Sequence, residues 1–234
     1  MLWGLRPVEA QATYGIAVDR LKRQIHSGLL LPAEKLPAER QLSDDFGISR
    51  VTLREALRVL ETDRYIVVKR GAYGGAFVTD EDRLAEMSKR RITREPANAM
   101  RVLEFLCVNE FAAAGYAADR RALPELKRMR RAMALMAEAV SLPLLKQSET
   151  FFHLALGDAS HNLLIARAIE DALAELFLPF VEPSFLALQT RMISEHTALF
   201  AAIDRGDAAT AQTAASQLHD GYWQKLRALT RSAA

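Results

Sequence analysis

Residues 36–60 read LPAERQLSDDFGISRVTLREALRVL, and their pattern predicts the fold of the N-terminal part of the chain. Four apolar residues stand at positions i, i+3, i+4 and i+7 of its second half: Leu53, Ala56, Leu57 and Leu60. This spacing puts them on one face of a helix, and that face must pack inward. Ser49 is a good N-cap for a helix over 50–63. Gly47 is a stop signal for a shorter helix over 38–46. The stretch therefore predicts two helices joined by a tight turn.

The segments on either side of this stretch add a further helix and a hairpin. Residues 12–27 carry apolar side chains at helical spacing and are followed by Gly28, another helix stop signal. Residues 65–69 and 76–79 are β-favouring runs around a glycine-rich tip, which predicts a hairpin. Helix, short helix, turn, helix and hairpin, in this order, form a winged helix-turn-helix. We therefore expect a domain that binds double-stranded operator DNA.

Cationic and hydroxyl side chains stand where such a domain would meet DNA. Arg50 and Arg54 lie one turn apart on the second helix of the motif, and the arginine fork suits both guanine edges and phosphates. The wing places Arg70 at a flexible tip that could follow a minor groove. The residues and their spacing predict DNA contacts by Arg40, Ser49, Arg50, Thr52, Arg54 and Arg70. Charged helix faces are usually only solvated, but helix order, arginine spacing and wing together favour the DNA interpretation.

Residues 36–42, LPAERQL, and 48–57, ISRVTLREAL, closely resemble the DNA-binding signature of the GntR family of bacterial transcription regulators. In that family the residues matching Arg40, Arg50 and Arg54 touch the operator, together with the glycine of the wing tip, here Gly71. The sequence departs from the family pattern at 62–65, because the family usually has a glycine before the first wing strand.

The rest of the chain predicts a linker and an all-helical domain. Residues 80–95 contain ten charged side chains, and glycine and proline become rarer after about residue 96. We expect a DNA-binding domain over 1–79, a linker over 80–96, and an all-α domain over 97–234 that binds an effector and mediates dimerisation. The predicted fold class is mainly α, with a small β-hairpin wing in the first domain and a helical bundle in the second.

Three histidines of the second domain lie on the apolar stripes of separate predicted helices: His153, His196 and His219. Glu149 precedes His153 by four residues, so both project from one helix face. Burying an unpaired carboxylate is unfavourable, and a divalent cation shared with neutral imidazoles would remove that penalty. The ligand set suits zinc, nickel, iron or manganese. The alternative, hydrogen-bonded core histidines, stays open. His26 is expected at the surface and His161 at a helix junction.

The predicted bundle, over about residues 97–230, is similar to the FCD domain of the FadR subfamily of GntR regulators. The resemblance implies a metal held by Glu149, His153, His196 and His219, although most metal-binding members have aspartate at the position of Glu149. It also implies a small carboxylate effector beside the metal, held by Arg101. The alternative for Arg101 is a surface ion pair with Glu104 or Glu95.

Composition excludes several classes of protein. One cysteine rules out an internal disulfide framework. No apolar run approaches the roughly 18 residues of a membrane-spanning helix, and the start lacks the pattern of a signal peptide, so we expect a cytoplasmic protein with no membrane partner. The net charge is only +2, so DNA binding rests on where the arginines stand, with weak non-specific binding and strong reliance on dimerisation.

We therefore expect a homodimeric, ligand-responsive transcription regulator, a repressor rather than an enzyme. Two alternatives remain. One is a metal-dependent enzyme that uses the His/Glu site to activate water or oxygen. The other is a regulator whose metal is purely structural, or which lacks a metal and binds an acyl-type effector in an apolar cavity.

Overall fold

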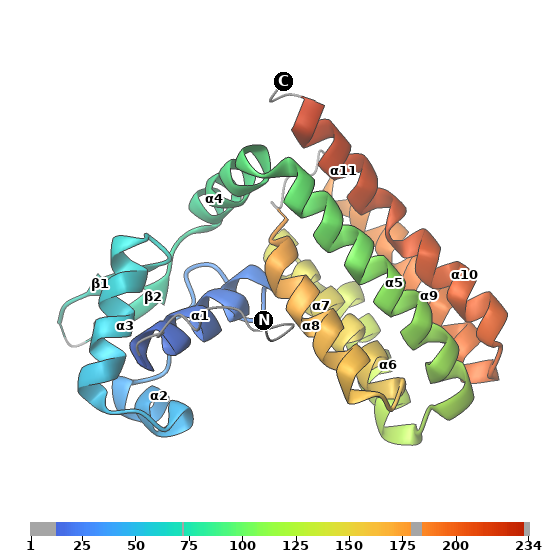
Figure 1. The fold of residues 1–234 in the computed structure, drawn as a ribbon, viewed down its shortest axis with the longest axis horizontal. Coiled ribbons are helices and arrows are strands. Elements are labelled where there is room, and N and C mark those ends of the chain that lie inside the picture. The colour runs from blue at the N-terminus through green and yellow to red at the C-terminus, as the bar shows by residue number, and fades with distance from the viewer. Residues whose placement is uncertain (1–12, 72, 179–183, 232–234) are drawn as a thin grey trace, which may run out of the picture.

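The N-terminal domain is a winged helix-turn-helix, as the sequence predicts (Figure 1). The computed structural model describes residues 13–71, 73–178 and 184–231. The elements of this domain are α1 (Thr13–His26), α2 (Glu39–Phe46), α3 (Arg50–Thr62), β1 (Ile66–Lys69) and β2 (Gly75–Val78). The two strands pair antiparallel, with Ile66 opposite Val78 and Lys69 opposite Gly75.

Local signals set the ends of the helices in this domain. The Ser49 side chain accepts a hydrogen bond from the Thr52 amide and caps α3, while Gly47 ends α2 with a left-handed φ of 63°. The apolar stripe of α3 faces the core of the domain, and Leu53 and Leu60 are completely buried. Arg64 has a φ of 64° at the turn into β1, which is the conformation that a glycine would supply at this place.

The predicted linker region contains a helix of its own. Helix α4 (Glu81–Arg94) is capped by the side chain of Asp80, which accepts a hydrogen bond from the Arg83 amide. Leu84 is buried in the core of the N-terminal domain, and α4 also packs against the last helix of the chain. Figure 1 shows α4 between the hairpin and the start of α5. The charged residues of this segment therefore form the outer face of a helix.

The C-terminal domain is a bundle of helices. They are α5 (Pro96–Arg120), α6 (Leu123–Glu138), α7 (Leu142–Ala159), α8 (Leu163–Leu176), α9 (Phe185–Arg205), α10 (Ala208–Leu218) and α11 (Asp220–Arg231). The long helix α5 contacts α7, α8, α9 and α10, so it lies at the centre of the packing. Leu103 and Leu106 of α5 pack with Phe152 of α7 and Leu199 of α9 in a core that excludes solvent. Among the described residues, no helix is long and apolar enough to cross a membrane.

The two domains meet where α1 packs against α8. The expected surface position of His26 is wrong: its side chain is buried and stacks on Phe177 with ring centroids 4.0 Å apart. Its Nδ1 donates to the Ala174 carbonyl, which leaves Nε2 to accept from the Tyr65 hydroxyl. Burial and the nearby Arg91 lower the pKa of His26 to about 3, so the ring is neutral. His161 lies at the junction of α7 and α8, as expected.

Phe177 closes the core of the N-terminal domain although it follows α8 in the second domain. Its carbonyl accepts a hydrogen bond from the buried Ser88 hydroxyl of α4. Exposed ion pairs from Arg23 to Asp171 and from Arg91 to Glu175 border the same junction. The junction is therefore an apolar contact with a charged rim.

Candidate functional site

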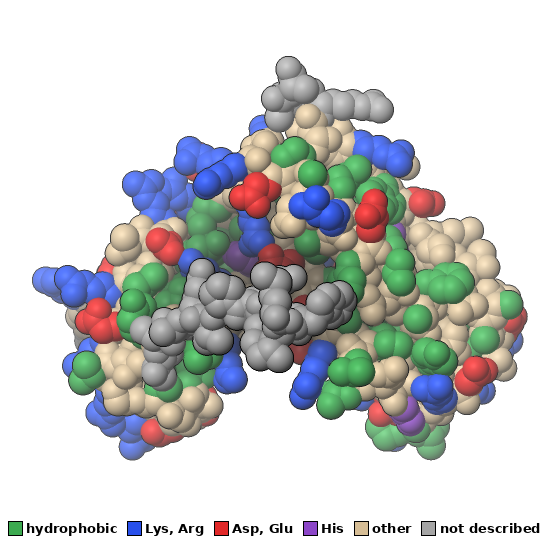
Figure 2. Space-filling view, in the orientation of Figure 1, with side chains coloured by type: hydrophobic (Ala, Val, Ile, Leu, Met, Phe, Trp, Pro, Cys, Tyr) green, Lys and Arg blue, Asp and Glu red, His purple; other side chains and the backbone are tan. Residues whose placement is uncertain are grey.

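The predicted DNA-contacting side chains lie on the outer surface of the N-terminal domain. Arg40, Arg50 and Arg54 are exposed. The Nε of Arg54 donates to the Glu39 carboxylate of α2 over 2.8 Å. Because both side chains of this pair are exposed, the ion pair is weak and can be exchanged for a phosphate or a base. Figure 2 shows Lys and Arg side chains along the outer margin of this domain, with acidic side chains between them.

The hydroxyls of the turn are already engaged within the protein. The Ser49 hydroxyl caps α3 and lies 2.8 Å from the Thr52 hydroxyl, so both are held at the start of the second helix of the motif. The wing exposes Arg70 and Gly71, and Gly71 has a φ of 107°. The backbone of the wing packs so closely at position 74 that only glycine fits, because a Cβ there would lie 2.4 Å from the Lys69 carbonyl oxygen.

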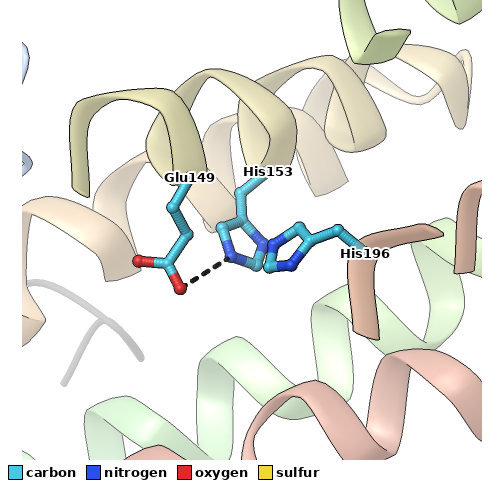
Figure 3. Close-up of side chains that lie close together, drawn as sticks. All are labelled: Glu149, His153 and His196. Carbon is cyan, nitrogen blue, oxygen red and sulfur yellow. Dashed lines mark ion pairs between the residues drawn. The ribbon is translucent and has the colours of Figure 1, made fainter. Parts of the chain in front are cut away.

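The second candidate site is a buried cluster between α7 and α9. Glu149 and His153 of α7 and His196 of α9 each offer a ligand atom, and these atoms lie within 4.8 Å of one another. Figure 3 shows Glu149 and His153 projecting from the same helix, with the ring of His153 next to the ring of His196. The Nε2 of His153 lies 4.0 Å from Oε1 of Glu149. The structure thus brings together three of the four predicted metal ligands.

The fourth predicted ligand, His219, is turned towards a carboxylate that sequence reasoning missed. Its Nε2 lies 3.1 Å from Oε2 of Glu110 on α5, and the other oxygen of Glu110 lies 2.8 Å from Nδ1 of His153. Glu110 is completely buried. A signal was present in the sequence, because Glu110 stands on the inward stripe of α5, four residues after Leu106.

The protonation state of each side chain in this cluster depends on the charges of its neighbours. Burial lowers the pKa of His153 and His219, but the Glu110 carboxylate outweighs it and raises their pKa values to about 9 and about 10. Burial raises the pKa of Glu110, but the two imidazoles outweigh it and hold that pKa at about 2. Burial and the charge of His153 lower the pKa of His196 to about 4. Glu110 is therefore an anion shared by two imidazolium rings, with His196 neutral beside them.

The unpartnered atoms of the cluster fit a divalent cation. The Nδ1 of His196 donates to the Met192 carbonyl over 2.7 Å, which leaves Nε2 as a lone-pair donor, buried and without a hydrogen-bond partner. Nε2 of His153 is likewise buried and lacks a hydrogen bond. Imidazole nitrogens with a carboxylate oxygen are a ligand set for transition-metal ions. A carboxylate that fixes the far nitrogen of a ligating histidine, as Glu110 does for His153, is common around such sites.

A cavity opens beside Glu149. Its polar lining consists of Lys146, Glu149, Arg191, Glu195, Tyr222 and Lys225, and five leucines, Met192 and Gly221 form the rest of the wall. The Lys146 ammonium donates to Glu149 over 3.2 Å and to the Tyr222 hydroxyl over 3.1 Å. Burial raises the pKa of Glu149, but this ammonium outweighs it and holds the pKa well below its ordinary value. Arg101 is exposed on α5 and does not belong to this lining, whereas Arg191 of α9 does.

The fold and the buried cluster define a DNA-binding protein with a helical domain suited to hold a small ligand. The model of the bacterial regulatory proteins of the gntR family matches residues 13–78, and the FCD domain model matches residues 101–221. The chain therefore belongs to the GntR family and carries an FCD domain of the FadR-like subfamily. This is a family of transcription regulators, not of enzymes, which excludes the metal-dependent enzyme considered from the sequence.

Two bacterial regulatory proteins and one solved structure are similar to this chain. A "Putative L-lactate dehydrogenase operon regulatory protein" of Escherichia coli K12 is 29% identical over 214 residues, which is 84% of this chain and 79% of that protein. The galactonate operon transcriptional repressor of the same organism is 28% identical over 225 residues, covering 91% and 96% of the two chains. The solved structure of E. coli McbR/YncC has the same fold, with a TM-score of 0.53 at 17% identity, and the match covers 96% and 100% of the two chains.

Proposed function

We propose that this regulator is a repressor that a small hydroxycarboxylic acid controls through the cavity beside the buried cluster. The observation that carries the proposal is the position of Glu149, which belongs both to the cluster with His153 and His196 and to the wall of the cavity. Around it the cavity wall carries three cationic side chains, from Lys146, Arg191 and Lys225. The same wall carries two carboxylates, from Glu149 and Glu195, so its net charge is positive, and a positively charged site favours an anionic ligand.

Glu149, His153 and His196 would hold a divalent metal ion. The buried Nε2 atoms of His153 and His196, which lack hydrogen-bond partners, support this assignment. His219 would join them only by giving up its contact with Glu110. A cation bound there would supply a Lewis-acidic charge towards an anionic effector. The protein's own contribution is to keep Glu149 ionised, to fix the ring of His153 through Glu110, and to aim Nε2 of His196 inward.

The cavity and the names of two relatives support this class of effector. The names of two relatives refer to the L-lactate dehydrogenase operon and to the galactonate operon. Lactate and galactonate are both 2-hydroxycarboxylates. Such an acid presents a carboxylate that Arg191 can bind through two parallel hydrogen bonds, and a hydroxyl next to it. Arg191 thereby takes the role that the family resemblance implies for Arg101.

We assign operator contacts to Arg40, Ser49, Arg50, Thr52, Arg54, Arg70 and Gly71, all on the outer face of the N-terminal domain. The arginines of α3 would reach base edges, and the wing would follow the backbone or minor groove. Two such domains are needed to read two half-sites. Apolar side chains exposed on α5, among them Phe105 and Val108, support a dimer formed through this helix.

A thermal-shift screen on metal-loaded and metal-stripped protein tests the effector proposal. L-lactate and D-galactonate are the probes, with succinate as an acid that lacks the hydroxyl. At 100 times its Kd a bound acid adds about 2.7 kcal/mol of stability. We expect a shift with a hydroxy acid that disappears after chelation. A shift that persists after chelation would indicate a structural or absent metal, and no shift with any hydroxy acid would contradict the effector class.

A further inference from the structure

Residues 146–150 of helix α7, about one and a half helical turns, contact both the buried cluster and the DNA-binding domain. Glu149 faces the cluster, while Gln147 and Thr150 face the segment that follows α1. The Thr150 hydroxyl donates to the Ser27 carbonyl over 2.6 Å, and the Gln147 amide donates to the Leu29 carbonyl over 3.0 Å. Both acceptors belong to residues 27–29, where the chain turns out of α1.

Lys146 connects the same two regions through one side chain. Its ammonium lies at the cavity, bound to Glu149 and to the Tyr222 hydroxyl. Its stem lies against Gly28, because a Cβ on Gly28 would come within 3.1 Å of Cγ of Lys146. Gly28 has a φ of 77°, a conformation that disfavours other residues. The stem of Lys146 is therefore confined on one side by the turn after α1, and its head is fixed on the other side by the cavity.

We propose that residues 146–150 of α7 couple occupation of the cavity to the position of the DNA-binding domain, with Lys146 as the group that responds to the acid. The proposal rests on the proposed function, since it needs an anion in the cavity. The carboxylate of the acid competes with Glu149 for the Lys146 ammonium. When the ammonium moves, the confined stem moves against Gly28 and shifts residues 27–29, to which Gln147 and Thr150 are tied.

The structure offers a second connection between the cavity and the DNA-binding domain, but the negative charge of the effector favours the connection through Lys146. Leu178 also lines the cavity, and its neighbour Phe177 lies in the core of the N-terminal domain. A carboxylate has no specific attraction for the leucine side chain, whereas it binds an ammonium directly. A ligand shifts an equilibrium only by its different affinity for the two arrangements, and the Lys146 ammonium supplies such a difference.

The double variant Gln147→Leu/Thr150→Val tests the coupling without changing the lining of the cavity. The full-length protein is titrated with L-lactate and D-galactonate by calorimetry, and with a DNA fragment that the wild-type protein selects from a random pool by fluorescence anisotropy. We expect the acid to change DNA affinity of the wild type by about 5- to 150-fold, the usual range of such couplings. In the double variant acid binding should stay unchanged, while the effect of the acid on DNA affinity should largely disappear.

Gly28→Ala provides a second test if the double variant folds poorly, because its methyl group presses on the Lys146 stem from the other domain. We expect its DNA affinity without acid to move towards the acid-bound value of the wild type. Asp171→Asn is the matched control, since it cuts an ion pair between α1 and α8 outside the cavity and should leave the response intact.

The outcomes separate the coupling from the proposed function. Acid binding with a full DNA response in the double variant would overturn the coupling and leave the effector proposal standing. A Gly28→Ala protein with wild-type DNA affinity and response would also overturn it, and so would a response lost only in Phe177→Ala. A wild-type protein that binds acid without any change in DNA affinity would contradict the proposed function itself.

Discussion

Metal binding by the buried cluster should release protons, and the number of protons counts the histidines that take part. At pH 7 His153 is protonated, because its pKa is about 9, and His196 is neutral, because its pKa is about 4. The ion pair with Lys146 keeps Glu149 ionised. Histidine must be neutral to ligate a metal. A metal held by Glu149, His153 and His196 therefore displaces one proton, from His153.

The size of the effect follows from this count. Each displaced proton makes the metal affinity tenfold higher per pH unit, or about 1.4 kcal/mol. Between pH 6 and pH 8 one proton gives a gain of about 100-fold, or about 2.7 kcal/mol. His219 has a pKa of about 10, so its participation would add a second proton. The gain over the same two pH units would then be about 10,000-fold.

Calorimetric titration with Zn²⁺ at pH 6, 7 and 8, in two buffers of different ionisation enthalpy, measures both the affinity and the proton count. His219→Gln is the control variant, since it leaves the three clustered ligands in place. We expect one proton for the wild type and the same value for this variant. Affinity that does not vary with pH, or a site that survives His153→Gln, would refute the assignment of the ligands.

Four further outcomes are expected. Arg54→Ala should weaken operator binding by roughly 1–3 kcal/mol and relax base preference at one position in a gel-shift assay, whereas Arg130→Ala on the bundle should have no effect. Phe105→Glu should dissociate the proposed dimer in sedimentation analysis without lowering the melting temperature of the protomer. Leu186→Glu, at an exposed apolar residue of α9, should leave the dimer intact. Arg64→Gly should raise the melting temperature. It removes about 1–2 kcal/mol of strain from the left-handed backbone, whereas the greater entropy of the unfolded chain costs roughly 0.5–1 kcal/mol. A lower melting temperature would show that the turn is unstrained. The metal-stripped protein should become less stable between pH 7 and pH 9. The raised pKa values of His153 and His219 contribute stability that is complete below pH 6.5 and is lost as the pH rises through the pKa values of the folded protein. A melting temperature that rises over this range would contradict those pKa values.

Local signals in the sequence were enough to predict the N-terminal domain. Ser49 caps α3 and Gly47 ends α2 because these residue types satisfy the backbone at a helix end whatever surrounds them. The stripe that begins at Leu53 is buried because helical periodicity alone assigns one face to the core. In the same way, Glu149 and His153 share a face because they are four residues apart.

Contacts between distant segments could not be predicted in this way. Glu110 stands on an inward stripe, but its partners His153 and His219 come from two other helices, and periodicity does not tell which stripes face one another. His26 stands at the end of a helix, close to the polar residues 22–24, and this position in the sequence indicates an exposed side chain. It is buried because a second domain packs onto that end of the helix. Sequence patterns therefore predict which face of a helix is buried, but not which other helices pack against that face.

Phe177 has a consequence for how the two domains can be exchanged. Its ring belongs to the hydrophobic core formed by α1, α3 and the wing strands, although the chain reaches it only after α8. A chimera that joins residues 13–78 to an unrelated sensory domain would leave the His26 ring without the aromatic side chain on which it stacks. We therefore expect that a functional chimera must bring along the helix end that completes this core.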